Sequence, residues 1–125
     1  MDIEQKVTSL ELSKQLKEAG ARQESERFWF VSSKMLGVGK SPVNAPQVAA
    51  FDCAELLEGL PVMIVTDKGN RFLVMGRYPN HDYWIGYKYV DGDGSLPGPV
   101  FHNRDFVESL GKTKLWCLKE GHVKE

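Results

Sequence analysis

The sequence predicts an α+β fold, a two-layer sandwich in which an antiparallel sheet of about four strands carries helices on one face. Residues 62–90 contain three runs of apolar, β-branched and aromatic residues separated by turn residues, which indicates a three-stranded meander. Helix-capping patterns precede periodic stretches outside this meander. Helices segregated from an antiparallel sheet define this class. The expected order of elements is α-β-α-β-β-β-α.

The composition is that of one globular domain spanning residues 1–125. Apolar residues make up 42% and charged residues 26% of the chain, and the formal net charge is -1. So small a charge steers the protein toward neither nucleic acid nor anionic lipid. The first residues lack an apolar signal segment, and no run approaches the about 18 apolar residues of a membrane span. We therefore expect a cytoplasmic location and no membrane partner.

Three helices are expected. The first runs from about Ser9 to Ala19 and the second, capped by Asp52 with Glu55 at its third position, runs to about Glu58. The third follows Asn103. Either it continues through Gly111 to residue 118, or it ends at that glycine and a strand follows over residues 114–118. We favour the long helix, although glycine inside a helix costs about 1 kcal/mol.

An aromatic strand is expected over Arg27–Ser33. Because both of its faces are apolar, it should either be covered on both faces or sit against a partner. Residues 34–48 then form a long connection that contains two glycines and two prolines. A connection of this length is either functional or mobile.

Three segments of the chain resemble small uncharacterised proteins encoded by bacteriophages and prophages. They are the opening TSLELSKQLKEAGARQESERFWF, the helix AFDCAELLEGLP and the closing ESLGKTKLWCLKEG. The resemblance covers about half of the chain and departs at Gly111–Thr113, where better helix formers would be expected. It implies a phage-type origin, with the host cytoplasm as the location, and it supplies no catalytic residues.

One loop contains part of a phosphate-binding motif. Lys40 and Ser41 stand where a phosphate loop has its Gly-Lys-Ser end. The motif requires a glycine five positions before Gly39, but Lys34 occupies that position. A helix should follow the loop, and Pro42 disfavours it. A plain loop is therefore favoured, and Lys40 and Ser41 are kept as a loop candidate.

The sequence predicts no metal site, no cofactor and no catalytic residue. Asp91–Ser95 begins like a calcium loop, but Leu96 and His102 replace its glycine and its final glutamate, so a turn is favoured. The histidines and cysteines lack zinc-site spacing. His102 could form an acid–base pair with a nearby carboxylate, although a polar loop histidine is the simpler interpretation.

The meander is apolar or aromatic on both faces, whereas a sheet with one wet face shows polar alternation. Either helices and the long connection cover most of it, or one aromatic face binds a ligand. For the second case we expect Trp84, Lys88, Arg71 and Arg77 to lie within reach of one ligand. Aromatic residues and arginine are favoured at protein interfaces.

The expected function is that of a non-enzymatic binding module, a phage-type accessory protein that acts on a host or phage protein and associates as a homodimer. One alternative is a nucleotide or single-stranded nucleic-acid binder that uses the aromatic sheet face. Another is a small hydrolase.

The residues expected to share one core are Leu12, Leu16, Leu56, Ile64, Val74 and Ile85.

Overall fold

The computed structural model of the chain describes residues 7–39, 46–80, 82–89 and 100–123. It confirms the α+β class, with three helices and two open antiparallel sheets within that part of the chain. The elements are α1 (Leu10–Glu18), β1 (Arg27–Phe30), β2 (Met35–Val38), β3 (Gln47–Ala50), α2 (Cys53–Gly59), β4 (Met63–Thr66), β5 (Gly69–Arg77), β6 (Tyr83–Tyr89), β7 (Phe101–Asn103) and α3 (Phe106–Lys119).

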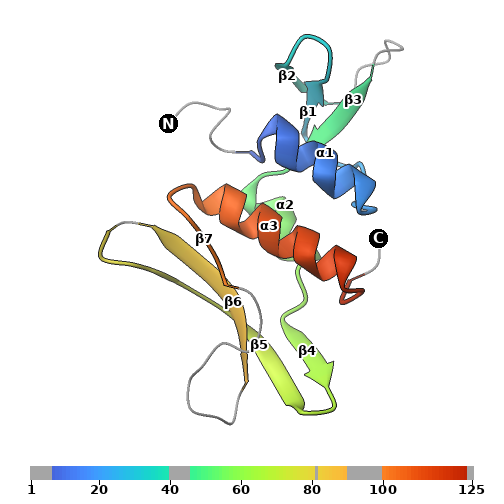
Figure 1. Cartoon of the computed structure of the whole chain (residues 1–125). Coiled ribbons are helices and arrows are strands. Elements are labelled where there is room, and N and C mark those ends of the chain that lie inside the picture. Colours follow the sequence, from blue (N-terminus) through green and yellow to red (C-terminus); the bar gives the residue numbers. More distant parts are fainter. Residues whose placement is uncertain (1–6, 40–45, 81, 90–99, 124–125) are drawn as a thin grey trace.

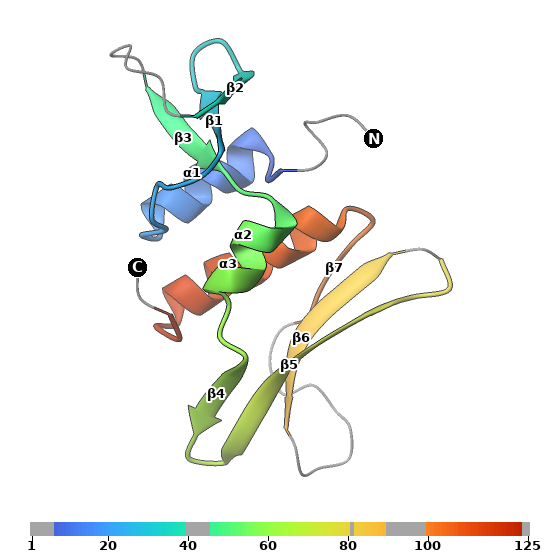
Figure 2. The same ribbon diagram turned by 180° about the vertical axis from the view of Figure 1, so that it is seen from behind.

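The helices lie between the two sheets (Figures 1 and 2). The three-stranded sheet has the order β2-β1-β3, and the four-stranded sheet has the order β4-β5-β6-β7. α1 packs against β3, while α3 packs against α1, α2, β6 and β7. Among the described residues, no helix is long and apolar enough to cross a membrane.

Each helix begins at a side-chain cap. Ser9 caps α1 by accepting a hydrogen bond from the Leu12 amide, and Asp52 and Glu55 form the predicted capping box of α2. The carboxylate that caps the Ser9 amide is not the nearby Glu11. It is Glu108 of α3, whose Oε1 accepts from the Ser9 N–H at 2.6 Å. The start of the first helix therefore depends on the last helix.

α3 is continuous through Gly111, so the long helix is correct and the alternative strand over residues 114–118 is wrong. The expected long connection was only partly right, because residues 34–48 contain β2 and the first residues of β3. The strand predicted over Arg27–Ser33 ends at Phe30, where the chain turns back into β2. These strands and β7 complete the sheets beyond the predicted meander.

The core lies between α1, α2, α3 and the two sheets. Five of the six predicted core residues are buried in one cluster: Leu12, Leu16, Leu56, Ile64 and Ile85. Val74 is a wrong prediction, because it pairs with Gly86 on the opposite face of the sheet from Ile85. Of the two alternatives for the aromatic strand, the first is correct, because β1 is covered on both faces. Phe28 enters the main cluster, and Trp29 enters a second cluster with Val7, Val48 and Ala50.

Candidate functional site

The strand register divides the four-stranded sheet into an inner and an outer face. Residues directly opposite each other in an antiparallel pair point to the same face. The inner face carries Ile85 and Tyr87 and packs against α3, where the Tyr87 and Trp116 rings lie 6.0 Å apart. The outer face consists of Met63, Val65, Asn70, Phe72, Val74, Gly76, Trp84, Gly86, Lys88 and His102.

The four predicted binding residues do not share one face. Trp84 and Lys88 are on the outer face, but Arg71 pairs with Tyr89 and Arg77 pairs with Tyr83 on the inner side. The expectation that all four lie on the Trp84 face of the sheet is therefore wrong. Arg71 Nη2 donates a hydrogen bond to the Tyr89 hydroxyl at 3.2 Å, and the Arg77 guanidinium lies 5.5 Å from the centre of the Tyr83 ring. Both arginines thus contact aromatic rings at the border of the inner face.

Aromatic side chains form one end of the outer face. The Trp84 indole lies across Gly76, since a β-carbon at that glycine would stand 2.6 Å from the ring. The Tyr78 ring is 6.5 Å from that of Trp84 and 6.4 Å from that of His102. A half-buried indole supported by the backbone of the next strand offers a rigid surface for contact.

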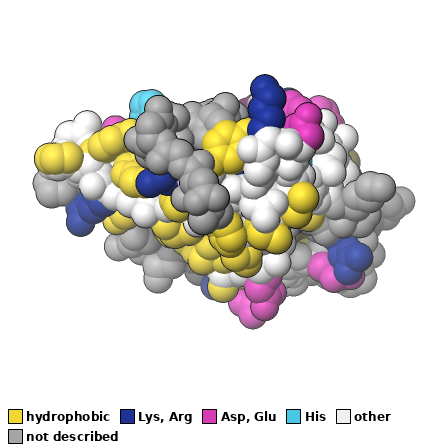
Figure 3. All heavy atoms as spheres, turned by 90° about the horizontal axis from the view of Figure 1, so that it is seen from below, with side chains coloured by type: hydrophobic (Ala, Val, Ile, Leu, Met, Phe, Trp, Pro, Cys, Tyr) yellow, Lys and Arg dark blue, Asp and Glu magenta, His cyan; other side chains and the backbone are white. Residues whose placement is uncertain are grey.

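The other end of the outer face is aliphatic and exposed. Met63, Val65 and Phe72 expose 41%, 72% and 38% of their surface. No acidic residue occurs among the strand residues of the outer face, whose one lysine is Lys88. Hydrophobic side chains are correspondingly frequent on the side of the molecule formed by this sheet (Figure 3). The outer face is thus an apolar surface with a slight positive character.

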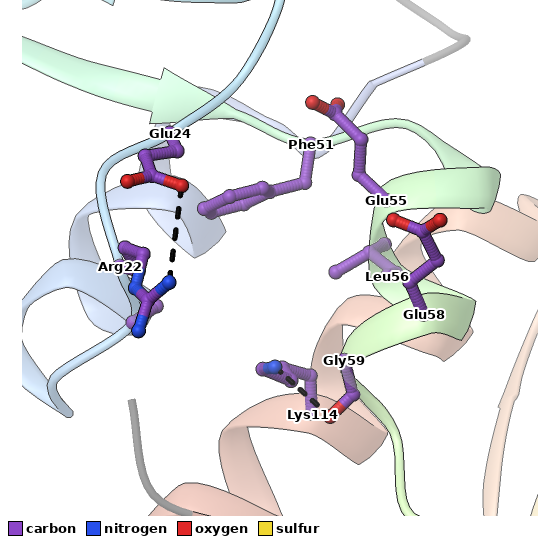
Figure 4. Close-up of a pocket in the computed structure, with 9 residues that line it drawn as sticks. Arg22, Glu24, Phe51, Glu55, Leu56, Glu58, Gly59 and Lys114 are labelled. Carbon is purple, nitrogen blue, oxygen red and sulfur yellow. Dashed lines mark hydrogen bonds and ion pairs between the residues drawn. The ribbon is translucent and has the colours of Figure 1, made fainter.

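A pocket of about 260 Å³ opens between α2, α3 and the segment after α1 (Figure 4). Phe51 and Leu56 give it apolar walls, and charged groups of both signs surround them. Lys114 is buried, and its Nζ donates a hydrogen bond to the Gly59 carbonyl at 3.1 Å. The volume is near the lower limit of ligand pockets, about 300 Å³. The full lining is Ala21, Arg22, Glu24, Phe51, Glu55, Leu56, Glu58, Gly59 and Lys114.

Four of the five charged residues at this pocket, all except Glu58, have contacts within the described part of the protein. The Glu55 carboxylate accepts hydrogen bonds from the Ser25 hydroxyl at 2.9 Å and from the Asp52 amide at 3.0 Å. Arg22 and Glu24 form an exposed ion pair at 4.0 Å. These charged residues therefore have a structural role that requires no ligand, and the pocket is a weaker candidate for a binding site than the outer face.

Neither cysteine has the character of an activated nucleophile. Burial raises the pKa of the Cys53 thiol, and the Asp52 carboxylate raises it further. Burial also raises the pKa of the Cys117 thiol. Both thiols are free of disulfides, but a raised pKa lowers the fraction of reactive thiolate at neutral pH.

The remaining predicted groups also have structural explanations or lie outside the described residues. The Asp105 carboxylate, which could have oriented His102, instead accepts from the Val107 amide at 3.0 Å and caps α3. Within the described residues, no group of three or more histidine, cysteine or acidic side chains could hold a metal ion. Lys40, Ser41 and Asp91–Ser95 lie outside the described part of the chain.

The sequence prediction of the surface missed Met63, Val65, Phe72, Tyr78 and His102. Alternation along each strand could have assigned Phe72 to one face, but only the pairing between strands shows that this face is also that of Trp84. Comparisons with protein-family models, curated proteins and solved structures found no match.

Proposed function

We propose that this protein is a non-enzymatic binding module that attaches to a protein partner through the outer face of its four-stranded sheet. The observation that carries the proposal is the asymmetry of that sheet. Helices cover its inner face, whereas no described helix covers the outer one, which is nevertheless apolar (Figures 1 and 2). Contiguous exposed apolar surface on a small protein marks an interaction site more often than a solvated face.

The chemistry of the outer face indicates the kind of partner surface that fits it. Trp84 and Phe72 supply large rings, which serve as anchors at protein interfaces. Lys88 adds a positive charge directly opposite Phe72 on the neighbouring strand. The complementary surface is apolar at its centre and carries a carboxylate at its margin.

A protein partner fits this face better than single-stranded nucleic acid does. Nucleic-acid binding depends on several cations that contact phosphates. Arg71 and Arg77, which would have supplied them beside Trp84, lie on the other side of the sheet. Lys88 alone is a weak basis for such binding. The resemblance to phage-encoded proteins suggests a host or phage protein in the bacterial cytoplasm as the partner.

The test is capture of a partner from bacterial lysate by the tagged protein and by two variants. Phe72→Glu places a charge on the outer face, and Val38→Glu places the same charge on β2, at a more exposed residue of the other sheet. We expect the wild type and Val38→Glu to retain the same protein after nuclease treatment, and Phe72→Glu to lose it. Thermal melts should show that both variants remain folded.

Two results would contradict the proposal. Retention of the captured protein by a folded Phe72→Glu variant would exclude the outer face as the binding surface. Loss of all captured material after nuclease treatment would favour the nucleic-acid alternative instead.

A further inference from the structure

β4 forms one edge of the four-stranded sheet, with β5 on one side only. Figures 1 and 2 show no described helix or strand along its other side. An edge strand presents unpaired backbone N–H and C=O groups and can pair with another strand.

The pairing with β5 identifies the outward-pointing backbone groups. Hydrogen-bonded and non-hydrogen-bonded pairs alternate along an antiparallel ladder. The Leu73 amide donates to the Val62 carbonyl at 3.0 Å, so Val62 belongs to a hydrogen-bonded pair, and so do Ile64 and Thr66 at alternate positions. Met63 and Val65 therefore direct their amides and carbonyls away from β5, toward the free edge.

The side chains of β4 do not protect this edge. Met63–Thr66 contains no charged residue, no proline and no glycine, and Val65 is 72% exposed. Proteins usually prevent edge association with lysine, proline or a bulge on the edge strand. The strand is therefore chemically ready to accept a further antiparallel strand.

We infer that two copies of this protein associate through β4, with the two strands antiparallel about a two-fold axis at Ile64. Met63 of one copy then lies opposite Val65 of its partner, and Val65 lies opposite the partner's Met63. Each of these pairs exchanges two N–H···O=C bonds, because both residues present their backbone groups at the edge. The two four-stranded sheets become one sheet of eight strands.

A second copy suits this edge because the pattern is self-complementary. Two outward-pointing residues separated by one inward-pointing residue match themselves when the strand is reversed. In this register Lys68, which lies in the turn after β4, is level with Leu60 of the partner copy. Leu60 follows the end of the partner's α2, and that helix carries Glu58. Both of these charged residues are exposed, so opposite charges approach each other.

β2 is the corresponding edge of the three-stranded sheet and provides a matched control. The Gly39 amide donates to the Glu26 carbonyl at 2.6 Å, so by alternation Val38 also directs its amide outward. Val38 is 83% exposed, slightly more than Val65. Gly37 within β2 weakens that strand as a template for pairing.

The first experiment measures mass in solution for the wild type, Val65→Pro and Val38→Pro by light scattering at high micromolar concentration. Each proline removes one outward amide and no ladder bond. We expect twice the 14.1 kDa of one chain for the wild type and Val38→Pro, and one chain for Val65→Pro. Circular dichroism checks the fold, and Val65→Lys replaces Val65→Pro if the proline variant unfolds.

The second experiment tests the register by oxidative cross-linking in a Cys53→Ser background. Residues in a hydrogen-bonded antiparallel pair have Cα atoms about 5.5 Å apart, within the range of a disulfide. Mixing Met63→Cys with Val65→Cys should therefore give a covalent dimer. Either variant alone should give little, because like residues are diagonal neighbours about 7–8 Å apart.

The inference is overturned by a wild type that has the mass of one chain, by a folded Val65→Pro or Val65→Lys variant that stays dimeric, or by equal cross-linking in all three cysteine preparations. A monomer that captures another protein, loses it in Val65→Pro and keeps it in Phe72→Glu would assign the edge to a foreign strand. The inference is independent of the proposed function, since Phe72→Glu leaves the backbone of β4 unchanged.

Discussion

Gly111 of α3 lies so close to Leu12 of α1 that a β-carbon on the glycine would stand 2.6 Å from the Leu12 Cδ2 atom. It would also stand 3.0 Å from the Cγ2 atom of Thr8. The glycine is therefore the residue that lets the two helices approach each other. The lower helix propensity of glycine is offset by this contact.

Gly111→Ala should destabilise the protein, although alanine favours a helix over glycine by about 1 kcal/mol. The added methyl group meets buried atoms of Leu12 and Thr8, and overpacking of a core costs roughly 1–3 kcal/mol. We expect urea melts to show a lower midpoint with an unchanged slope.

The double variant Gly111→Ala/Leu12→Ala is the control for this explanation. Removing the leucine side chain makes room for the new methyl group. The losses of unfolding free energy in the two single variants should therefore sum to more than the loss in the double variant. Additive costs would show that the close contact is not the cause.

Leu16→Ala should lower the free energy of unfolding by about 2–5 kcal/mol. Leu16 is completely buried in the main core, so its truncation leaves a cavity between α1 and its neighbours. Gln15→Ala, at an exposed position beside it, should change stability by no more than about 0.5 kcal/mol. Chemical denaturation of the two variants checks both values, and equal midpoints would refute the described core.

Trp84→Ala and Trp29→Ala should differ in their effect on folding. Trp29 is buried in the second cluster and donates from Nε1 to the Thr8 carbonyl at 2.9 Å, so its removal should cost about 3–5 kcal/mol. Trp84 is only half-buried on the outer face, and its removal should cost clearly less. If denaturant melts show an equal loss for both, Trp84 is a core residue and not part of a binding surface.

Stability should fall at alkaline pH because of Tyr87. Burial raises the pKa of its phenol, the neighbouring Cys117 raises it further, and its hydroxyl donates to the Pro61 carbonyl at 2.8 Å. Below the unfolded pKa of about 10, the phenol is protonated in both states and its contribution is complete. Above it, only the unfolded chain releases the proton, so unfolding becomes more favourable as the pH rises.

Urea melts between pH 8 and pH 11 should show this loss for the wild type and a shallower one for Tyr87→Phe. Tyr89→Phe gives the opposite comparison. The hydrogen bond from Arg71 lowers the pKa of Tyr89, so this tyrosine contributes stability that increases with pH. Its removal should steepen the alkaline loss. Identical profiles for all three proteins would contradict these assignments.

Local signals in the sequence predicted all three helices and the meander. The capping box of Asp52 and Glu55 needs only residues three apart, and it fixes the start of α2. β2 is four and β7 is three residues long. β2 pairs with β1 across a turn, and β7 pairs with β6 across a longer segment, so no local pattern distinguishes these strands from a connection. The contact from Glu108 to Ser9 spans 99 positions and has no sequence signature.

The candidate surface was predicted only in part, because a face depends on how strands pair. Arg71 and Arg77 alternate with Phe72 along β5, and that alternation was evident from the residues alone. Their position relative to Trp84 depends on the hairpin that joins β5 and β6, in which Arg77 pairs with Tyr83. A shift of one residue in this register would have placed both arginines on the same face of the sheet as the tryptophan.

The central position of α3 has a consequence for the synthesis of the chain on the ribosome. α3 is the last described element, yet it covers the inner sheet face, packs on α1 and supplies Glu108 to the start of α1. The main core cluster includes Val107, Leu110 and Cys117 of α3, so it cannot close before residues 106–119 leave the ribosome. Its apolar surface should be exposed to chaperones until then. A nascent chain stalled at Asp105 should accordingly be cleaved by a protease at sites that the released protein protects.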